Sequence, residues 1–128
     1  MGLFVLEADA ALAGADTILP DGSLANKAGT LLLALAARHC RVPFFALAET
    51  SKIAPASGHR TPFPREEREA EEVLPDAIAG VSVRNVYFDL TPPRYITGYI
   101  TERGLLDRRD VTALAREAPG LIVMKDEG

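Results

Sequence analysis

The chain has 128 residues, a formal net charge of −4, 48% hydrophobic residues and 25% charged residues. This length fits a single domain, residues 1–128, rather than a two-domain enzyme, and the composition is that of a soluble globular protein, which excludes the disordered and fibrous classes. The acid excess, with Arg108 and Arg109 as the only adjacent basic pair, argues against direct nucleic-acid binding, because that needs a concentrated basic surface.

Cys40 is the only cysteine, so the sequence allows neither an intrachain disulfide nor a cysteine-cluster zinc site. The amino end has no signal-peptide pattern, and the longest apolar run, residues 31–37, is far shorter than the roughly 20 residues of a membrane-spanning helix. We therefore expect a cytoplasmic protein in a reducing compartment, with no membrane contact, no metal and no other cofactor.

The chain begins with two short apolar runs, residues 2–6 and 10–13. The first run has β character, and together the two predict one or two buried strands. The turn-forming sequence Pro-Asp-Gly at residues 20–22 closes this region.

A helix is predicted over residues 26–38, where leucines and alanines favour helix and Asn26 is available as a cap. Residues 42–48 are continuously apolar rather than alternating, which predicts a fully buried strand. Strand, helix and strand in succession form a βαβ unit and therefore a parallel sheet.

The middle of the chain changes in composition. Prolines and glycine at residues 54–64 predict a loop. Residues 65–72 carry seven charges in eight positions, which is typical of a solvated helix face rather than of a binding tail.

The carboxy-terminal third contains further predicted elements. Residues 81–83 and 86–88 are rich in β-forming residues, and the Pro-Pro pair that follows favours a short helix over residues 94–101. Residues 110–117 predict an amphipathic helix, and residues 121–124 a final strand.

Asp16 stands just past the first predicted strand region, where an open parallel sheet has its ligand crevice at the carboxyl ends of the strands. Asn26 can donate and accept hydrogen bonds, and Lys27 can hold a phosphate or carboxylate near a helix amino end. These three residues predict a small pocket for an anionic ligand. The alternative is that Asp16 caps a turn while Asn26 and Lys27 cap a helix, each on its own.

Eight segments carry a family resemblance, in this order: 14–23 (GADTILPDGS), 26–30 (NKAGT), 33–37 (LALAA), 42–44 (VPF), 50–52 (TSK), 88–93 (FDLTPP), 96–98 (ITG) and 100–104 (ITERG). The chain resembles the carboxy-terminal domain of the translation initiation factor 2B α/β/δ-subunit family. That family also includes methylthioribose-1-phosphate isomerase and ribose-1,5-bisphosphate isomerase. The resemblance runs from about residue 10 to residue 106.

This resemblance implies an α/β fold in three layers, a truncated Rossmann-like domain with a mostly parallel sheet of about four strands. In the isomerases, the aspartate that matches Asp16 is a general acid/base, and residues that match Asn26 and Lys27 contact the sugar phosphate. Burial at the strand end would raise the pKa of Asp16 toward the working range. Asp89 or Lys52 is expected near these three residues.

The sequence also departs from the family pattern. The isomerases carry a catalytic cysteine on an earlier strand and a helical amino-terminal domain, and neither is present here. Cys40 does not replace that cysteine, because it lies at the far end of the predicted helix, about 20 Å from Asn26. We therefore do not expect isomerase activity from this chain alone.

Three functions remain open. The chain is a binding or assembly module related to initiation factor 2B subunits, a sugar-phosphate isomerase completed by another chain, or a folded remnant without function. A phosphorylated sugar or nucleotide is the expected ligand.

A homodimer, or a complex with a related subunit, is the expected assembly. Its surface is predicted at residues 88–100, where Tyr95, Ile96 and Tyr99 accompany Tyr87. An open sheet edge and an apolar face are also expected near residues 3–6. The alternative is that the tyrosines and Ile96 pack against the chain's own sheet.

Overall fold

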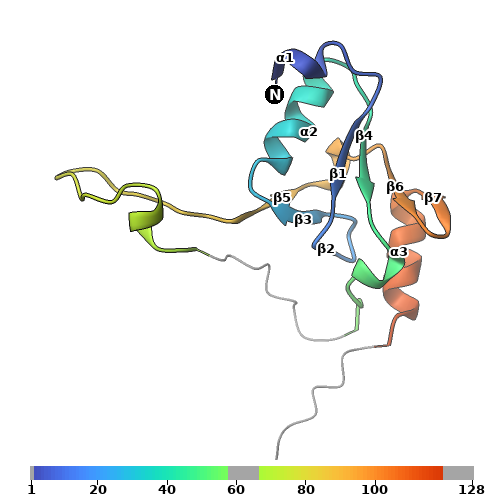
Figure 1. Cartoon of the computed structure of the whole chain (residues 1–128). Helices are drawn as coiled ribbons and strands as arrows, with labels where there is room; N and C mark the ends of the chain where they lie inside the picture. Colours follow the sequence, from blue (N-terminus) through green and yellow to red (C-terminus); the bar gives the residue numbers. More distant parts are fainter. Residues whose placement is uncertain (1, 58–66, 120–128) are drawn as a thin grey trace, which may run out of the picture.

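Two small sheets and three helices form the body of the protein, and residues 67–87 project from it as an arm (Figure 1). The computed structural model describes residues 2–57 and 67–119. In chain order the elements are α1 (Gly2–Val5), β1 (Ala11–Gly14), β2 (Thr17–Ile18), β3 (Leu24–Lys27), α2 (Thr30–His39), β4 (Phe44–Leu47), η1 (Thr50–Lys52), η2 (Ala70–Glu72), β5 (Phe88–Thr91), η3 (Pro93–Tyr95), β6 (Gly98–Thr101), β7 (Gly104–Leu106) and α3 (Arg108–Glu117).

The main sheet has four strands in the order β1-β4-β6-β7. β4 pairs in parallel with β1 on one side and with β6 on the other, and β7 is antiparallel to β6. The predicted α/β fold with a mostly parallel sheet is therefore confirmed. A strand within residues 42–48 is confirmed as β4, an inner strand of this sheet. The predicted full burial is wrong, because only the face with Phe44 (1% exposed) and Ala46 (0%) is covered, whereas Leu47 on the other face is 51% exposed.

A second sheet, which we did not predict, contains three antiparallel strands in the order β2-β3-β5. β3 is its central strand, and Leu24 and Ala25 of β3 are completely buried. A parallel bridge between Ile18 and Ile53 joins this sheet to the segment that follows β4. The second sheet thereby lies next to the carboxyl ends of the main strands.

Small side chains bring the helices close to the sheets. α2 buries Ala34 and Ala37, and α3 buries Val111 and Ala115. The predicted helix at residues 110–117 is thus confirmed, with its apolar residues facing the core. The largest fully buried side chains are Tyr99, Phe44, Ile18, Leu24, Val111 and Thr91.

The predictions for residues 2–6 and 94–101 were wrong. Residues 2–6 form no strand: α1 is one helical turn, in which Leu3 and Phe4 are exposed. Residues 94–101 form no helix: one 3-10 turn, η3, is followed by β6, which pairs with β4. The hydroxyl of Thr97 accepts a hydrogen bond from the backbone of Phe44 (3.1 Å), so pairing with the central strand outweighs the local helical preference of the double proline.

The long helix begins later than predicted. Asn26 and Lys27 belong to β3, where they lie opposite Asp89 and Phe88 of β5. α2 starts only at Thr30, after Gly29 turns the chain with a φ of 105°. A positive φ of this kind is accessible to glycine without steric cost.

The arm has little regular structure. Of the predicted helix at residues 65–72, the described part contains only the 3-10 turn η2, and its side chains are exposed as expected. Residues 81–83 are not a strand, and Val86 makes an isolated antiparallel bridge with Glu67. The predicted strand at residues 121–124, most of the predicted loop at residues 54–64, and residues 65–66 lie outside the described residues.

Candidate functional site

Asp16 lies at the predicted place in the fold, two residues past the carboxyl end of β1. Its backbone N–H donates to the carbonyl of Ala25 in β3 (3.0 Å). The Asp16 side chain is exposed, so the burial that we expected there is absent. The first candidate residue is therefore beside β3, with its carboxylate in solvent.

Asn26 organises the turn into α2. Its side-chain N–H donates to the hydroxyl of Thr30 (3.1 Å), and that hydroxyl donates to the carbonyl of Lys27 (2.7 Å). Asn26 is half-buried. These contacts all lie within residues 26–30, in agreement with the alternative that Asn26 caps the helix. The side-chain oxygen of Asn26 can still accept a hydrogen bond.

Asp89 caps α2 from across the sheet. Its carboxylate accepts hydrogen bonds from the backbone N–H groups of Gly29 (2.8 Å) and Leu31 (3.1 Å). The expectation that Asp89 lies near Asn26 agrees with this geometry, since the two residues are paired across β3 and β5. However, these N–H groups already hold a carboxylate, so they are not available to a ligand phosphate.

The Lys27 ammonium group lies over two aromatic rings. Its Nζ is 5.2 Å from the centre of the Tyr87 ring and 4.8 Å from that of Phe88. Arg68 lies 5.2 Å from the same Tyr87 ring. Such contacts attract a cation to the ring face and leave its hydrogen-bond donors free to turn toward an anion.

The segments that follow β4 and β6 are joined by hydrogen bonds. Glu102, just after β6, accepts hydrogen bonds from the backbone N–H (2.8 Å) and the hydroxyl of Thr50 in η1. The hydrogen bond from the Thr50 hydroxyl is the main reason why the pKa of Glu102 is lowered. We did not identify Glu102 from the sequence; its place after a predicted helix concealed that it follows a parallel strand.

Lys52 is exposed in the same 3-10 turn as Thr50. The backbone of Ala54 donates to Ile18 in β2 (2.8 Å), which fixes this turn beside the segment that contains Asp16. The carboxyl ends of β1, β4 and β6 thus bring Asp16, Lys52 and Glu102 to one edge of the main sheet. An edge with two carboxylates and the ammonium group of Lys52 can bind a phosphorylated, hydroxyl-rich ligand.

Cys40 lies elsewhere, as predicted. It is the C-cap residue of α2, at the opposite end of that helix from Asn26, and it is half-buried. Its backbone N–H donates to Ala36 (2.9 Å). At a rise of 1.5 Å per residue, α2 separates Cys40 from Thr30 by about 15 Å.

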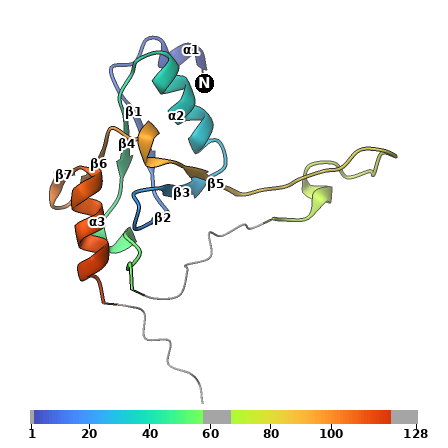
Figure 2. The same ribbon diagram turned by 180° about the vertical axis from the view of Figure 1, so that it is seen from behind.

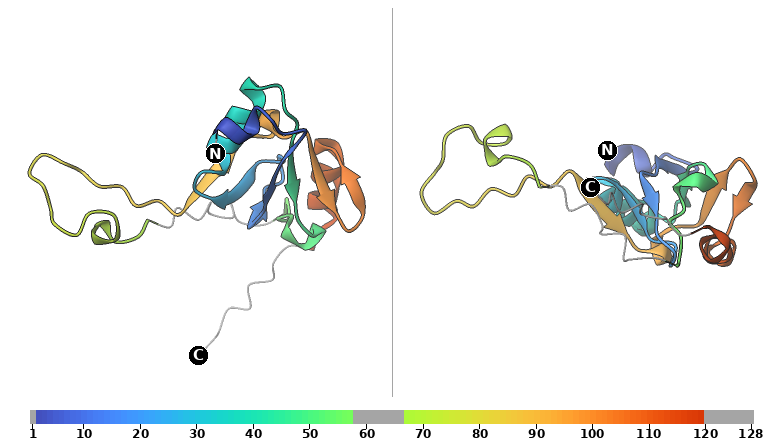
Figure 3. Two further views of the ribbon diagram at one scale, coloured as in Figure 1. Left: turned by 45° about the horizontal axis from the view of Figure 1, so that its top comes forward. Right: turned by 90° about the horizontal axis from the view of Figure 1, so that it is seen from below.

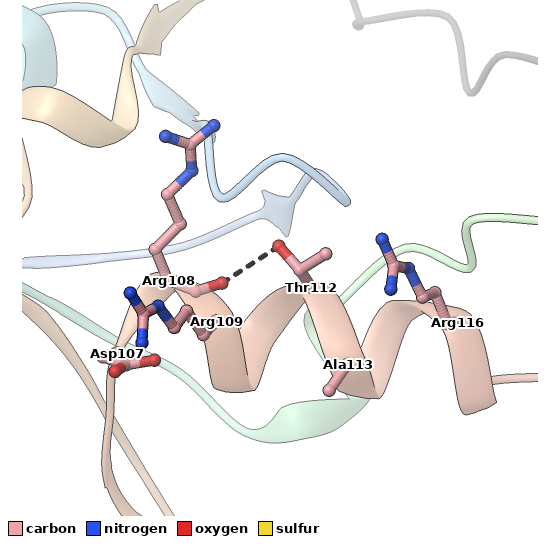
Figure 4. A pocket seen from close by; sticks show the side chains of 6 residues that line it. All are labelled: Asp107, Arg108, Arg109, Thr112, Ala113 and Arg116. Atoms are coloured by element: carbon pink, nitrogen blue, oxygen red, sulfur yellow. Dashed lines mark hydrogen bonds between the residues drawn. The ribbon is translucent and has the colours of Figure 1, made fainter.

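An open cavity of about 630 Å³ lies along α3, away from the candidate residues (Figure 4). It is lined by Asp107, Arg108, Arg109, Thr112, Ala113 and Arg116. Arg108 is engaged in the fold, since its Nε donates to the carbonyl of Asp21 (2.9 Å). The sequence revealed the pair Arg108 and Arg109, and the helix adds Arg116 two turns later.

Within residues 2–57 and 67–119, no three His, Cys, Asp or Glu side chains are grouped so that they could hold a metal ion. In the same ranges no helix has the length and apolar character needed to cross a membrane.

The chain matches a known family over most of its length. The sequence model of the Initiation factor 2 subunit family matches residues 1–108. The ribose 1,5-bisphosphate isomerase of Archaeoglobus fulgidus is 42% identical over 126 residues, covering 97% of this chain and 40% of the relative. A putative translation initiation factor eIF-2B subunit 2-like protein of Pyrococcus horikoshii is 46% identical over 109 residues, covering 83% of this chain and 36% of the relative.

Solved structures agree with these sequence matches. The 5-methylthioribose 1-phosphate isomerase of Pyrococcus horikoshii superposes with a TM-score of 0.73 at 40% identity, covering 87% of this chain and 34% of that one. The eIF-2B subunit delta of A. fulgidus gives a TM-score of 0.74 at 28% identity, covering 90% of this chain and 36% of that one. The chain therefore spans between a third and two fifths of the length of these relatives.

Proposed function

Because this chain belongs to the Initiation factor 2 subunit family, we propose that it is a binding and assembly module of that family. Its ligand is a phosphorylated sugar or nucleotide, held by Asp16, Asn26 and Lys27. The observation that carries this proposal is the convergence of β1, β4 and β6 ends with β3 at one edge of the sheet. Asp16, Lys27 and Lys52 are all exposed, and Lys27 lies on β3, whose Ala25 accepts a hydrogen bond from the backbone of Asp16 (3.0 Å).

Each of the three residues has a chemical role in this proposal. Lys27 provides the charge for a phosphate group, and its stem is oriented by Tyr87 and Phe88. Asp16 accepts hydrogen bonds from sugar hydroxyls, and the side-chain oxygen of Asn26 accepts another. Asp89 positions Asn26 and α2 rather than the ligand.

Binding without turnover is the expected behaviour of the isolated chain. General acid–base chemistry by Asp16 requires a partner group on the other side of the sugar carbon atoms. Cys40, the only cysteine of residues 1–128, is separated from the site by the length of α2.

Calorimetric titration with ribose 1,5-bisphosphate tests this proposal. We expect Lys27→Met to weaken binding at least tenfold, because methionine keeps the packing on the rings but loses the charge. Arg109→Met is the matched control, since it removes one exposed positive charge from the α3 cavity. If Arg109→Met weakens binding and Lys27→Met does not, the ligand occupies the α3 cavity and the proposal is wrong.

A second candidate is an aldose–ketose isomerase completed by another chain. The 42% identity to the ribose 1,5-bisphosphate isomerase over nearly the whole chain favours it. The purified chain would be mixed with the remaining amino-terminal part of such a relative and the conversion of ribose 1,5-bisphosphate followed by NMR. Conversion that disappears in Asp16→Asn would establish this candidate, and no conversion in any mixture would exclude it.

Self-association is part of the proposed assembly role, but the predicted surface needs correction. Tyr99 is 1% exposed and its hydroxyl donates to the carbonyl of Gly22. Tyr95 and Ile96 also pack against the core cluster. The alternative in which these residues pack against the chain's own sheets therefore holds for Tyr99, while Tyr95 and Ile96 are only partly buried.

A further inference from the structure

The arm joins the body at Tyr87, next to the candidate site. Tyr87 is the last residue of the arm, and its backbone carbonyl accepts a hydrogen bond from the N–H of Ala28, directly after β3 (2.7 Å). The arm leaves the body beside β3 and β5, on the side away from α3 (Figures 2 and 3). The hydrogen bond to Ala28 fixes the backbone of Tyr87 beside Lys27, the residue that provides the charge for the ligand phosphate in the proposed site.

Two rings support the Lys27 ammonium group, and they are held in different ways. Phe88 lies in β5, directly opposite Lys27 of β3, so the sheet fixes the backbone that carries this ring, 4.8 Å from Nζ of Lys27. Tyr87, whose ring centre is 5.2 Å from the same Nζ, belongs to no strand. Because its side chain can change rotamer, the place of the Tyr87 ring depends on what holds its hydroxyl end.

Glu72 of η2 holds that hydroxyl end. The Tyr87 hydroxyl donates to the Glu72 carboxylate, and the Asn85 side chain donates to the same carboxylate oxygen (2.9 Å). Asn85 also donates to the backbone carbonyl of Glu69 (2.9 Å), so the two sides of the arm are joined at this point. The hydrogen bond from Tyr87 is the main reason why the pKa of Glu72 is lowered. Glu72 is therefore ionised at neutral pH and is a strong acceptor for the phenol.

The charge of Glu72 also acts through the ring. A phenol that donates to a carboxylate becomes richer in electrons, and an electron-rich ring face attracts cations more strongly. Two cations use this ring, since the Arg68 guanidinium is also 5.2 Å from its centre. The backbone N–H of Arg68 donates to the carbonyl of Asn85 (2.8 Å), so Arg68 is held by the arm, whereas Lys27 is held by the body. The Tyr87 ring thus joins the arm to the cation of the proposed site.

We propose that Glu72 is a positioning residue of the ligand site. It holds the Tyr87 ring, and this ring holds the Lys27 ammonium group in place for the phosphate of the ligand. The inference rests on the proposed function and adds a residue of the arm to it. The charged run at residues 65–72 was expected to be only a solvated surface, and Glu72 gives one of its members a role at the site.

The alternative is that the contact between Glu72 and Tyr87 only keeps the arm folded. The ion pair between Arg84 and Glu67 serves that purpose as well. In this case Lys27 stays in place when Glu72 is replaced. The position of Lys27 therefore distinguishes the two roles, and the folding of the arm does not.

NMR of the ligand-free chain measures that position. The chain has three lysines, Lys27, Lys52 and Lys125, so isotope labelling of lysine gives three ε-methylene signals, and Lys27→Arg identifies one of them. We expect the Lys27 signal to be shifted upfield by the ring currents of Tyr87 and Phe88. Glu72→Ala should reduce this shift by at least half, and Glu72→Gln, which keeps an acceptor oxygen, should restore most of it.

Glu71→Ala is the matched control for Glu72→Ala. Glu71 lies in the same turn η2 and carries the same charge, but the Tyr87 hydroxyl donates to Glu72. The amide spectrum of the body confirms that each variant is folded. A Lys27 signal that is unchanged in Glu72→Ala, or that moves equally in Glu71→Ala, would overturn the proposal.

Calorimetric titration with ribose 1,5-bisphosphate then measures the effect on binding. Glu72→Ala and Glu71→Ala remove the same charge from η2 and so relieve a similar repulsion of the phosphate. We nevertheless expect the dissociation constant to rise at least threefold in Glu72→Ala and to change less than twofold in Glu71→Ala, because an exposed cation–π contact is worth a few-fold in affinity. Equal dissociation constants for the two variants would contradict the positioning role. If the unchanged chain binds no ribose 1,5-bisphosphate while the Lys27 signal behaves as expected, the positioning contact is supported and only the proposed ligand is wrong.

Discussion

Asp89 stabilises a helix start that lies far from it in the sequence. Its carboxylate accepts from Gly29, 60 residues away, and from Leu31, 58 residues away. The N-cap residue Gly29 has no side chain to do this. Without Asp89, two backbone N–H groups at the positive end of the helix would have only water as a partner.

We therefore expect Asp89→Ala to lower the free energy of unfolding by about 1–2 kcal/mol, the usual cost of losing an N-terminal cap. Urea denaturation at neutral pH measures this loss. Glu7→Ala, which removes an exposed carboxylate near α1, should change stability by less than about 0.5 kcal/mol. If both substitutions change the free energy of unfolding equally, the hydrogen bonds of Asp89 contribute nothing, and only the loss of a negative charge is measured.

Tyr99 is a second residue whose role is set by its surroundings. Burial, and then the nearby Asp21 carboxylate, raise the pKa of Tyr99 to about 12 from its usual 10. The folded chain therefore holds this proton more tightly than the unfolded chain does. The stability associated with Tyr99 is complete below pH 10 and decreases as the pH rises toward 12.

Between pH 10 and 12 this loss should reach on the order of 2 kcal/mol. Tyr99→Phe should lower the free energy of unfolding by about 1 kcal/mol at pH 7, because the hydrogen bond to Gly22 is lost. Above pH 10 the stability of this variant should fall less steeply than that of the unchanged chain. Chemical denaturation of both chains across this range gives the comparison. If the free energies of unfolding of the two chains fall in parallel with pH, Tyr99 ionises in the folded chain as readily as in solvent.

At the scale of the elements, α3 begins with a side-chain cap from its own N-cap residue, whereas the N-cap residue of α2 provides none. The Asp107 side chain accepts from the backbone of Asp110 (2.9 Å), and the Asp110 side chain accepts from the backbone of Asp107 (2.8 Å). The main cause of the lowered pKa of Asp107 is this backbone hydrogen bond from Asp110. Both partners are three residues apart, so this capping box is visible in the sequence, whereas the cap of α2 is not.

Asp107→Ala should cost about 1 kcal/mol of stability and fray the first turn of α3. Hydrogen exchange resolves the effect by element: amides at the start of α3 should exchange faster, while those of α2 keep their rates. The variant Asp107→Ser is the control, because serine can accept the same hydrogen bond and should restore most of the loss. Uniformly faster exchange in both helices would indicate global destabilisation instead.

Whether the contacts that stabilise an element are local or distant in the sequence also explains which elements could be predicted. The strand at residues 42–48 has its signal in its own residues, which are apolar throughout, although only the face with Phe44 and Ala46 is buried and Leu47 on the other face is 51% exposed. The run at residues 2–6 is too short for its apolar residues to distinguish strand from helix. For residues 94–101 the information lies in β4, which pairs with Gly98–Thr101, and no local pattern contains it.

At the scale of the whole molecule, the order of the strands determined how far the site could be predicted. Placing Asp16 at a carboxyl strand end needed only the parallel sheet. The contacts of Asn26 and Lys27 needed the second, antiparallel sheet, because β3 and β5 bring Asp89, Tyr87 and Phe88 beside them. That sheet joins segments about 60 residues apart in the sequence, so its pairing could not be inferred from any single stretch.

The whole-molecule architecture also predicts that the arm and the body are energetically separate. None of the described arm residues is fully buried, so replacing residues 73–83 with a short Gly-Ser linker removes no core packing. We expect the free energy of unfolding of the monomer, measured in urea at low protein concentration, to change by less than about 1 kcal/mol, because a shorter loop alters closure entropy only slightly. Leu24→Ala, at a completely buried position of β3, should cost about 2–5 kcal/mol in the same assay. A loss of similar size in the linker variant would show that the arm folds onto its own body, since only buried apolar surface gives an effect of that magnitude.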